Sequence, residues 1–319
     1  MTDELLTVVV RKREQQAEGV VALELVDPAG QPLPVFEAGA HIDLHLKGDL
    51  VRQYSLCNNP ADRSAYRVGV LRDPDSRGGS IAVHEHLHEG TELQISAPRN
   101  LFPLSETNGR SILIGGGIGI TPMIAMAYAL HAAGKPFDIW YCGRSRATSA
   151  FIDDLANSPF AAQVHFWFGD EHDGKRVDLE AVYEGSDDTT HMYTCGPAGF
   201  MDWVMDAAAS KGFSDDRMHK EFFQVEVETG GEAFEVYAEA SDITVTVGPD
   251  QTIAQALNAA GMKIPVSCEQ GTCGTCLCDV VEGIPEHRDV FLTDEEKEDN
   301  DQMTICCSRS KTPRLVLDL

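Results

Sequence analysis

Four cysteines in the last sixth of the chain have the side-chain type and spacing that hold an iron–sulfur cluster. Cys268, Cys273 and Cys276 follow the pattern C-x4-C-x2-C, and 29 residues separate the third of them from Cys306. Three thiolates close in sequence and a distant fourth are typical of plant-type [2Fe–2S] sites. We therefore predict that these four thiolates bind a [2Fe–2S] cluster.

Two neighbouring cysteines leave the ligand set open. Cys278 could replace Cys276, and Cys307 could replace Cys306. We favour Cys276 because it keeps the x4-x2 spacing, and Cys306 because it ends the apolar run 303–305. A zinc site is the alternative, but zinc sites more often use two matched C-x2-C pairs. The nine cysteines are odd in number and crowded, which argues against a disulfide framework.

The glycines between the predicted ligands fit a cluster loop. Gly271 and Gly274 alternate with the cysteines. A residue without a side chain lets backbone N–H groups approach sulfur, and such hydrogen bonds stabilise the more negative reduced cluster.

A second set of residues, in the first hundred, could hold a flavin. Arg52 would neutralise a phosphate, Tyr54 would stack on the ring system, and Ser55 would place a hydroxyl near a ring nitrogen. Taken alone, this motif is better interpreted as an ordinary strand with an exposed arginine. The run 77–80 (RGGS) strengthens the flavin interpretation, because Gly78, Gly79 and Ser80 precede a possible helix whose N–H groups could hold a phosphate.

A third set could bind a nicotinamide nucleotide. The run Gly115, Gly116, Gly117 joins an apolar strand to a helix for which Thr121 looks like the N-cap. This is not the standard dinucleotide fingerprint, because Pro122 stands where the third glycine would be. The run 195–197 (Cys195, Gly196, Pro197) ends another predicted strand, and strand ends line the ligand crevice in such sheets. The alternative for Cys195 is a buried structural thiol.

The elements that must position these residues fall into three textures. Residues 1–103 contain six short alternating strands, which predict a small antiparallel β-barrel. Residues 104–226 alternate strands with helices, which predicts a Rossmann-like α/β sheet. After a possible linker at 225–232, residues 233–319 combine a hairpin, a short helix and the cysteine loop. We expect three domains with these bounds.

Charge and hydropathy exclude several classes of function. The 319 residues carry 51 acidic against 25 basic side chains, a net charge of −26, which disfavours binding to nucleic acid or an anionic membrane. The uncharged stretch 111–134 is broken by glycines and a proline, so we do not expect it to span a membrane. The N-terminal order of charges is the reverse of a secretory signal, so we expect a cytoplasmic protein.

On these motifs the whole chain resembles the phthalate dioxygenase reductase family, and 233–319 resembles a plant-type ferredoxin with a β-grasp fold. The resemblance implies a flavin domain, a nicotinamide domain and a ferredoxin in that order. It implies FMN rather than FAD, and NADH as the main electron donor. It also adds the strand residues Gly69, Val70 and Leu71 to the flavin contacts. Phe223 aligns with an aromatic that reaches back over the flavin, although a core phenylalanine is nearly as good an interpretation.

The expected function is that of the reductase component of a Rieske-type oxygenase system. No catalytic residue is predicted, because the cofactors carry the chemistry. Arg144 and Arg146 leave the choice between NADH and NADPH open on residues alone, since arginine can accept a 2′-phosphate. The alternative function is a redox- or NADH-sensing regulatory protein without sustained turnover. The substrate of the partner oxygenase is not predicted.

Overall fold

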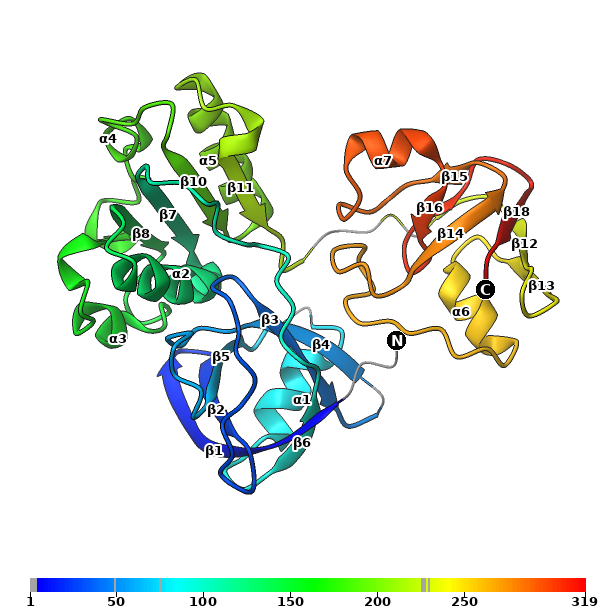
Figure 1. The fold of residues 1–319 in the computed structure, drawn as a ribbon, viewed down its shortest axis with the longest axis horizontal. Helices are drawn as coiled ribbons and strands as arrows, with labels where there is room; N and C mark the ends of the chain where they lie inside the picture. The colour runs from blue at the N-terminus through cyan, green and yellow to red at the C-terminus, as the bar shows by residue number, and fades with distance from the viewer. Residues whose placement is uncertain (1–4, 49, 75, 225–227, 229) are drawn as a thin grey trace. The chain divides into compact units, whose positions relative to one another are not determined.

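The computed structural model describes residues 5–48, 50–74, 76–224, 228 and 230–319 (Figure 1). The chain divides into two compact units, residues 1–223 and residues 224–319. Parts of the predicted linker, residues 225–227 and 229, lie outside the described residues. The division into three domains stays a prediction.

The first sheet is antiparallel and contains all six strands predicted in the first hundred residues. Its order is β4-β3-β6-β1-β2-β5. The strands are β1 (Leu6–Ala17), β2 (Val20–Val26), β3 (His41–Leu46), β4 (Leu50–Ser55), β5 (Tyr66–Leu71) and β6 (Glu92–Ile95). An antiparallel bridge between Leu56 and Val68 joins the two edge strands, so the sheet closes into a barrel. Helix α1 (Gly79–His86) follows β5.

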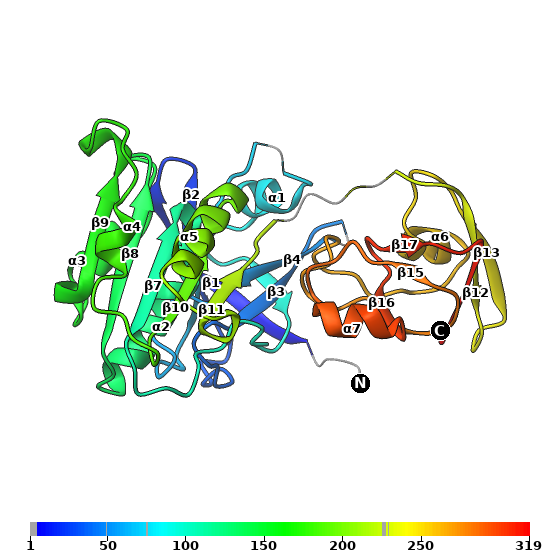
Figure 2. The ribbon, with the colours of Figure 1, turned by 90° about the horizontal axis from the view of Figure 1, so that it is seen from above.

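The second sheet is parallel, as the alternation of strands and helices predicts. Its order is β11-β10-β7-β8-β9 (Figure 2). The strands are β7 (Ser111–Gly116), β8 (Phe137–Gly143), β9 (Val164–Phe168), β10 (His191–Cys195) and β11 (Met218–Glu221). The helices are α2 (Ile120–Ala132), α3 (Ile152–Ala156), α4 (Leu179–Val182) and α5 (Ala198–Ser210). Every residue of β7 is buried, as expected for a central strand covered on both faces.

One predicted detail of this sheet is wrong. Thr121 is not the N-cap of α2, because a short 3-10 turn, Gly117–Gly119, leads directly into the helix at Ile120. The Thr121 hydroxyl instead donates to the carbonyl of Ile118 at 3.0 Å, within the first turn. The helix ends at Ala132, and Gly134 turns the chain away from it with φ of +64°.

A continuous hydrophobic core joins the barrel to one face of the parallel sheet. It includes Leu23 and Ile42 of the barrel, Met123 of α2 and Ile139 of β8. A separate core on the other face packs α4 and α5 against β7 and β10. The shared core explains why residues 1–223 form one compact unit although they contain two sheets.

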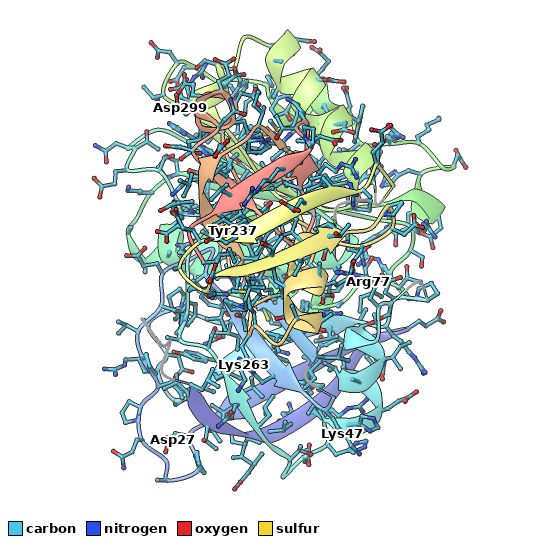
Figure 3. All side chains as sticks on the ribbon, turned by 90° about the vertical axis from the view of Figure 1, so that its right-hand side faces the viewer. Asp27, Lys47, Arg77, Tyr237, Lys263 and Asp299 are labelled. Carbon is cyan, nitrogen blue, oxygen red and sulfur yellow. The ribbon has the colours of Figure 1, made fainter. Side chains whose placement is uncertain are left out.

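The second unit combines a mixed sheet with a helix and the cysteine loop. Its order is β13-β12-β18-β14-β16, and β15 pairs with β17 apart from it. The elements are β12 (Phe234–Ala238), β13 (Ile243–Val247), α6 (Ile253–Ala259), β14 (Leu277–Glu282), β15 (Pro285–Glu286), α7 (Asp294–Asp299), β16 (Gln302–Thr304), β17 (Arg309–Ser310) and β18 (Arg314–Leu317). The predicted hairpin is present and is formed by β12 and β13. Figure 3 labels Tyr237 on β12 and Asp299 at the end of α7.

Candidate cofactor sites

The predicted flavin residues of the barrel lie together around the start of α1. Arg52, Tyr54 and Ser55 are on β4, and Gly78 caps α1 with φ of +91°. The Arg52 guanidinium donates to the carbonyl of Arg77 at 3.1 Å. Its side chain crosses Gly79 so closely that a Cβ there would lie 3.1 Å from Arg52 Nε. The two groups predicted to bind a phosphate, the Arg52 guanidinium and the start of α1, therefore lie next to each other.

The end of β5 faces the parallel sheet at a close approach that needs glycine. A Cβ on Gly69 would lie 2.7 Å from the ring of Phe151 and 3.0 Å from Thr121 Cγ2. Phe151 is almost completely buried and has φ of +61°, a conformation that a bulky residue adopts only when its surroundings impose it. Val70, which is buried, and Leu71, which is exposed, follow Gly69 on the strand.

The predicted nucleotide residues lie at the carboxyl ends of adjacent parallel strands. Gly115 on β7 is in register with Cys195 on β10, and Cys195 is in register with Glu221 on β11. A Cβ on Gly116 would lie 2.7 Å from the ring of Phe200, so this strand end also packs tightly against α5. Strand ends of this kind bind ligands in open α/β sheets.

The turn after β7 leaves open space at one glycine. Gly117 has φ of +57°, and a Cβ there would meet no atom within 4 Å. Gly196, after β10, lies against Gly116, and Pro197 precedes the first residue of α5. The two turns predicted to bind the nucleotide, 115–117 and 195–197, therefore meet at the same end of the sheet.

Glu221 connects the flavin strand with the nucleotide strands, and the sequence analysis missed it. The Ser55 hydroxyl donates to Glu221 Oε2 at 3.2 Å. Burial raises the pKa of Glu221 from 4.5 to about 8, although the hydrogen bond from Ser55 opposes this shift. Burial and the neighbouring Glu221 raise the pKa of the Cys195 thiol, which therefore stays protonated. Glu221 lies two residues before Phe223, the residue that the sequence analysis named in this region. Phe223 is 36% exposed.

The arginine that left the nucleotide preference open is engaged with a carboxylate. Arg146 Nε donates to Glu171 Oε1 at 2.5 Å, and its guanidinium lies 4.8 Å from the centre of the Phe168 ring. This pairing engages Arg146 at the surface, whereas Arg144, the other arginine considered for a 2′-phosphate, is exposed.

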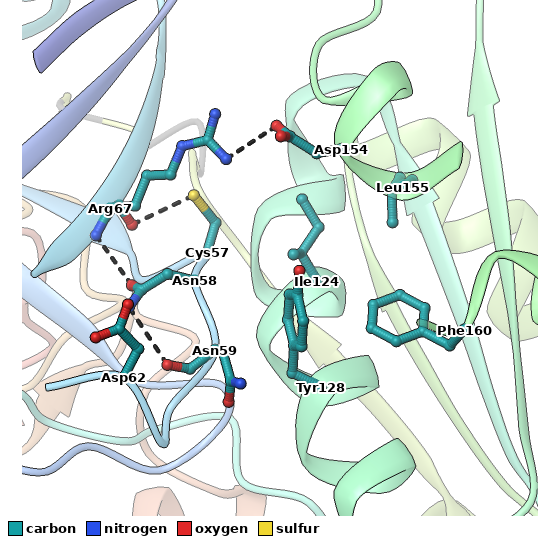
Figure 4. Close-up of a pocket in the computed structure, with 10 residues that line it drawn as sticks. All are labelled: Cys57, Asn58, Asn59, Asp62, Arg67, Ile124, Tyr128, Asp154, Leu155 and Phe160. Atoms are coloured by element: carbon teal, nitrogen blue, oxygen red, sulfur yellow. Dashed lines mark hydrogen bonds and ion pairs between the residues drawn. The ribbon is translucent and has the colours of Figure 1, made fainter. Parts of the chain in front are cut away.

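A cavity of about 190 Å³ lies between the barrel and the α2–α3 face (Figure 4). It is lined by Cys57 and the loop after it, by Tyr128 of α2 and by Asp154 of α3. Arg67 Nη1 pairs with Asp154 Oδ2 at 2.9 Å across it. None of the residues predicted to bind a cofactor lines this cavity, so it is separate from the sites above.

The four predicted cluster ligands are buried and interact in pairs. The thiols of Cys273 and Cys306 hydrogen-bond with Cys268, and the thiol of Cys276 with Cys306. Among the described residues, no three His, Cys, Asp or Glu side chains surround a point where a single metal ion would fit. A [2Fe–2S] cluster needs a different arrangement, because each iron takes only two protein ligands. Four paired thiols therefore fit the cluster better than a single ion.

Backbone donors surround the first ligand. The N–H groups of Gln270 and Thr272 point to Cys268 Sγ at 3.4 Å each. The thiols of Cys273 and Cys306, together with these donors, lower the pKa of the Cys268 thiol and so favour the thiolate that iron requires.

The two alternative cysteines have other surroundings. Cys278 is on β14, in register with Met303 of β16, and is part of the hydrophobic core of this unit. Cys307 lies 3.2 Å from the Thr304 hydroxyl, behind the loop, where a Cβ on Gly271 would lie 2.5 Å from its sulfur. Cys278 thus belongs to the core, whereas Cys307 also interacts with the predicted ligand Cys306. The contacts that link Cys276 and Cys306 to Cys268 and Cys273 favour the predicted set of four.

The glycines of the loop allow close packing in addition to the backbone contacts to sulfur. Gly271 and Gly274 have φ of +67° and +69°, and the N–H donors to sulfur come from residues beside Gly271. A Cβ on Gly271 would lie 2.6 Å from Asp289 Cβ, and one on Gly274 would lie 2.6 Å from the Phe291 ring. Glycine is therefore needed to turn the loop and to let the 289–291 segment pack behind it.

Comparisons with known proteins agree with this arrangement. Residues 236–311 match the 2Fe-2S iron-sulfur cluster binding domain. The chain is 48% identical over 317 residues to the vanillate O-demethylase oxidoreductase of Pseudomonas sp. (strain HR199 / DSM 7063), with 99% of this chain and 100% of that protein covered.

Two solved structures cover 99% of this chain. One is phthalate dioxygenase reductase, described as a modular structure for electron transfer from pyridine nucleotides to [2Fe–2S], with a TM-score of 0.79, 36% identity and 98% of that chain covered. The other is an intact type IV self-sufficient cytochrome P450 monooxygenase, with a TM-score of 0.84 and 40% identity, of which this chain spans 41%. These matches confirm the predicted fold class of β-barrel, α/β nucleotide-binding sheet and β-grasp ferredoxin.

Proposed function

Because this chain belongs to the oxygenase reductase family of vanillate O-demethylase oxidoreductase and phthalate dioxygenase reductase, we propose that it passes electrons from NADH through FMN and a [2Fe–2S] cluster to an oxygenase. The relatives are reductases, and nothing in the comparisons supports the alternative of a regulatory sensor.

One observation carries the proposal for the first unit. Glu221 hydrogen-bonds Ser55 of the flavin strand at 3.2 Å and is in register with Cys195 of the nucleotide sheet. Residues proposed for two different cofactors thus meet at the carboxyl of the half-buried Glu221. Hydride transfer needs its two partners in contact, and this is the part of the unit where both predicted sites converge.

The chain's own residues position the cofactors and exclude water. When bound, the nicotinamide supplies a hydride, the flavin converts the pair of electrons to single ones, and the cluster carries them singly. Arg52 and the start of α1 would hold the FMN phosphate, and Gly117 leaves space for the nucleotide phosphates. Cys195 is buried and Glu221 is half-buried at the meeting point, where a lowered dielectric strengthens polar contacts to the reacting rings.

The second unit would hold the cluster through Cys268, Cys273, Cys276 and Cys306. The N–H groups of Gln270 and Thr272 donate to the first of these sulfurs and would stabilise the negative charge of the reduced cluster.

The proposed acceptor is a Rieske-type oxygenase that docks on this unit. Residues 228–319 carry 18 acidic against 6 basic side chains, and exposed acids gather on α7 (Asp294–Asp299). An acidic face suits docking onto a basic patch of the partner, where electrostatic attraction speeds the encounter. Among the described residues, no helix is long and apolar enough to cross a bilayer.

A cysteine pair two residues apart tests the electron path. Cys276→Ser should abolish transfer to a one-electron protein acceptor while NADH oxidation by small two-electron dyes continues. Cys278→Ser is the matched control, because this buried thiol belongs to the core of β14. It should keep the cluster absorbance and both activities.

Two results would count against the proposal. If folded Cys276→Ser also lost dye reduction, the linear order of NADH, FMN and cluster would be wrong. If Cys278→Ser lost the cluster and Cys276→Ser kept it, the ligand set would be wrong.

A further inference from the structure

His287 is buried close to the cluster loop, and its ring has no hydrogen-bond partner. It is the single histidine of residues 224–319. Its side chain is 8% exposed, and within the described part of the chain neither ring nitrogen makes a hydrogen bond. Buried polar groups are nearly always paired, so an unpaired ring of this kind calls for an explanation. Histidine is also the side chain whose charge ordinarily changes near neutral pH.

Asp289 is the carboxylate that faces this ring. His287 Nδ1 lies 3.6 Å from Asp289 Oδ1, beyond hydrogen-bond range but close enough for an ion pair if the ring is charged. The Asp289 side chain is fully buried. Its Oδ2 accepts the N–H of Leu292 at 2.9 Å, and its Oδ1 accepts the hydroxyl of Ser308 at 3.3 Å. These donors stabilise the ionised carboxylate without water.

The pair lies directly behind the loop that carries the first three cluster ligands. Asp289 packs against Gly271 of that loop, and Val290 N–H donates to the Gly271 carbonyl at 3.1 Å. A buried polar chain also runs from Ser308 through the Thr304 hydroxyl to Cys307, next to the fourth ligand. Buried protein, rather than solvent, therefore separates a charge at His287 from the cluster. Buried protein screens a charge only weakly.

Other charged groups around the ring set its ordinary state. Burial lowers the pKa of His287, Asp289 raises it, and Lys297 of α7 and Lys311 after β17 lower it further. Arg288, the next residue, is held by Glu286, to which it donates at 2.7 Å and 3.0 Å. The net direction of these effects on the pKa is downward, so the ring is neutral near neutral pH. An added electron nearby favours the charged ring.

We propose that His287 takes up one proton when the cluster gains one electron, that Asp289 holds the resulting imidazolium, and that the pair makes the reduction potential of the cluster depend on pH. The proposal rests on the cluster assigned under the proposed function. One electron arrives from the flavin and one proton arrives from solvent at an imidazole nitrogen. On reoxidation the electron passes to the oxygenase and the proton returns to solvent, so charge and atoms balance.

The test is a redox titration of the full holoprotein at several pH values. The cluster is followed by the electron paramagnetic resonance signal of its reduced form, which separates it from the flavin. Between about pH 5 and about pH 8, the wild-type potential should fall as pH rises, with a slope approaching 59 mV per pH unit, the equivalent of a tenfold change for one electron. His287→Gln should give a flat line.

Two further variants separate the proton from a general structural effect. Asp289→Asn keeps an acceptor for Leu292 N–H and should move the sloping region to lower pH, since the imidazolium loses its counter-charge. His131→Gln, at an exposed histidine of the first unit, should leave the slope unchanged.

Each outcome decides the matter. A flat wild-type titration, or a His287→Gln slope equal to that of the wild type, would overturn the inference and leave the cluster assignment intact. Purified protein with no cluster signal would overturn the assignment as well.

Discussion

Glu221→Gln is the substitution for which the structure gives the clearest quantitative expectation. The glutamine keeps an oxygen that can accept the Ser55 hydroxyl, which donates at 3.2 Å in the structure. It removes only the ability to ionise. Any pH dependence that disappears with the substitution therefore belongs to the carboxyl of Glu221.

The sign and size of the effect follow from the raised pKa. The pKa of Glu221 is raised from 4.5 to about 8 by burial. Below pH 4.5 the carboxyl is neutral in both folded and unfolded chains, so its contribution to stability is fully present. As pH rises the unfolded chain ionises first, and the free energy of unfolding falls by somewhat more than 1 kcal/mol per pH unit. The loss is complete above about pH 8 and amounts to a few kcal/mol, because Glu221 is half-buried and solvent screens part of the effect.

The assay is urea unfolding of wild type and Glu221→Gln at matched pH values. The quantity compared is the difference in the free energy of unfolding at each pH, because titrations elsewhere in the chain cancel in it. We expect the variant to gain stability over the wild type steadily from about pH 5 to about pH 8, by several kcal/mol. Glu92→Gln, at an exposed position of β6, is the control and should change stability by less than about 0.5 kcal/mol throughout.

A flat difference between Glu221→Gln and wild type would refute the reasoning. It would mean that the carboxyl reaches solvent or a cation that the structure does not place beside it. A difference that grew as pH fell would reverse the sign and would show that the folded protein favours the carboxylate.

Three other predictions address the loop, the barrel seam and docking. Gly271→Ala should lose most of the cluster absorbance, because the residue has φ of +67° and a Cβ would lie 2.5 Å from a sulfur, whereas Gly261→Ala, with φ of +94° and open space, should keep the cluster. Gly69→Ala should lower the flavin content and destabilise the protein by about 1–3 kcal/mol, since a Cβ would lie 2.7 Å from the Phe151 ring; unchanged flavin content would show that β5 yields without cost. Transfer to the oxygenase should slow as salt rises, and a salt-independent rate would argue against docking through the acidic face.

Much of the fold could be predicted from the sequence, because strands and helices leave patterns in neighbouring residues. Turn residues separate the six barrel strands, of which β6 alternates exposed and buried positions, and strands such as β7 are short apolar runs between turns. The start of α2 was predicted two residues late, because Thr121 and Pro122 look like an N-cap and a first helical residue. The glycine turn winds directly into the helix instead and takes over the capping role.

The site residues were only partly readable, because some are brought together by tertiary contacts. The cysteine spacing identifies a cluster from nearby residues alone. Glu221 has no local motif, since its importance comes from burial beside Ser55, which lies 166 residues earlier in the chain. The clash that requires glycine at position 69 likewise depends on Phe151, on a loop of the other sheet. The signal that the sequence offered for Glu221 was an acidic residue two positions before Phe223.

The division into two compact units on one chain has a kinetic consequence. Covalent connection turns the meeting of the flavin and cluster units into an intramolecular event, with an effective concentration in the millimolar range for short connections. Transfer between them should therefore be first order and insensitive to dilution. Electron transfer to a separate oxygenase remains second order. Dilution should therefore slow reduction of the oxygenase, while reduction of the cluster within the chain keeps its rate.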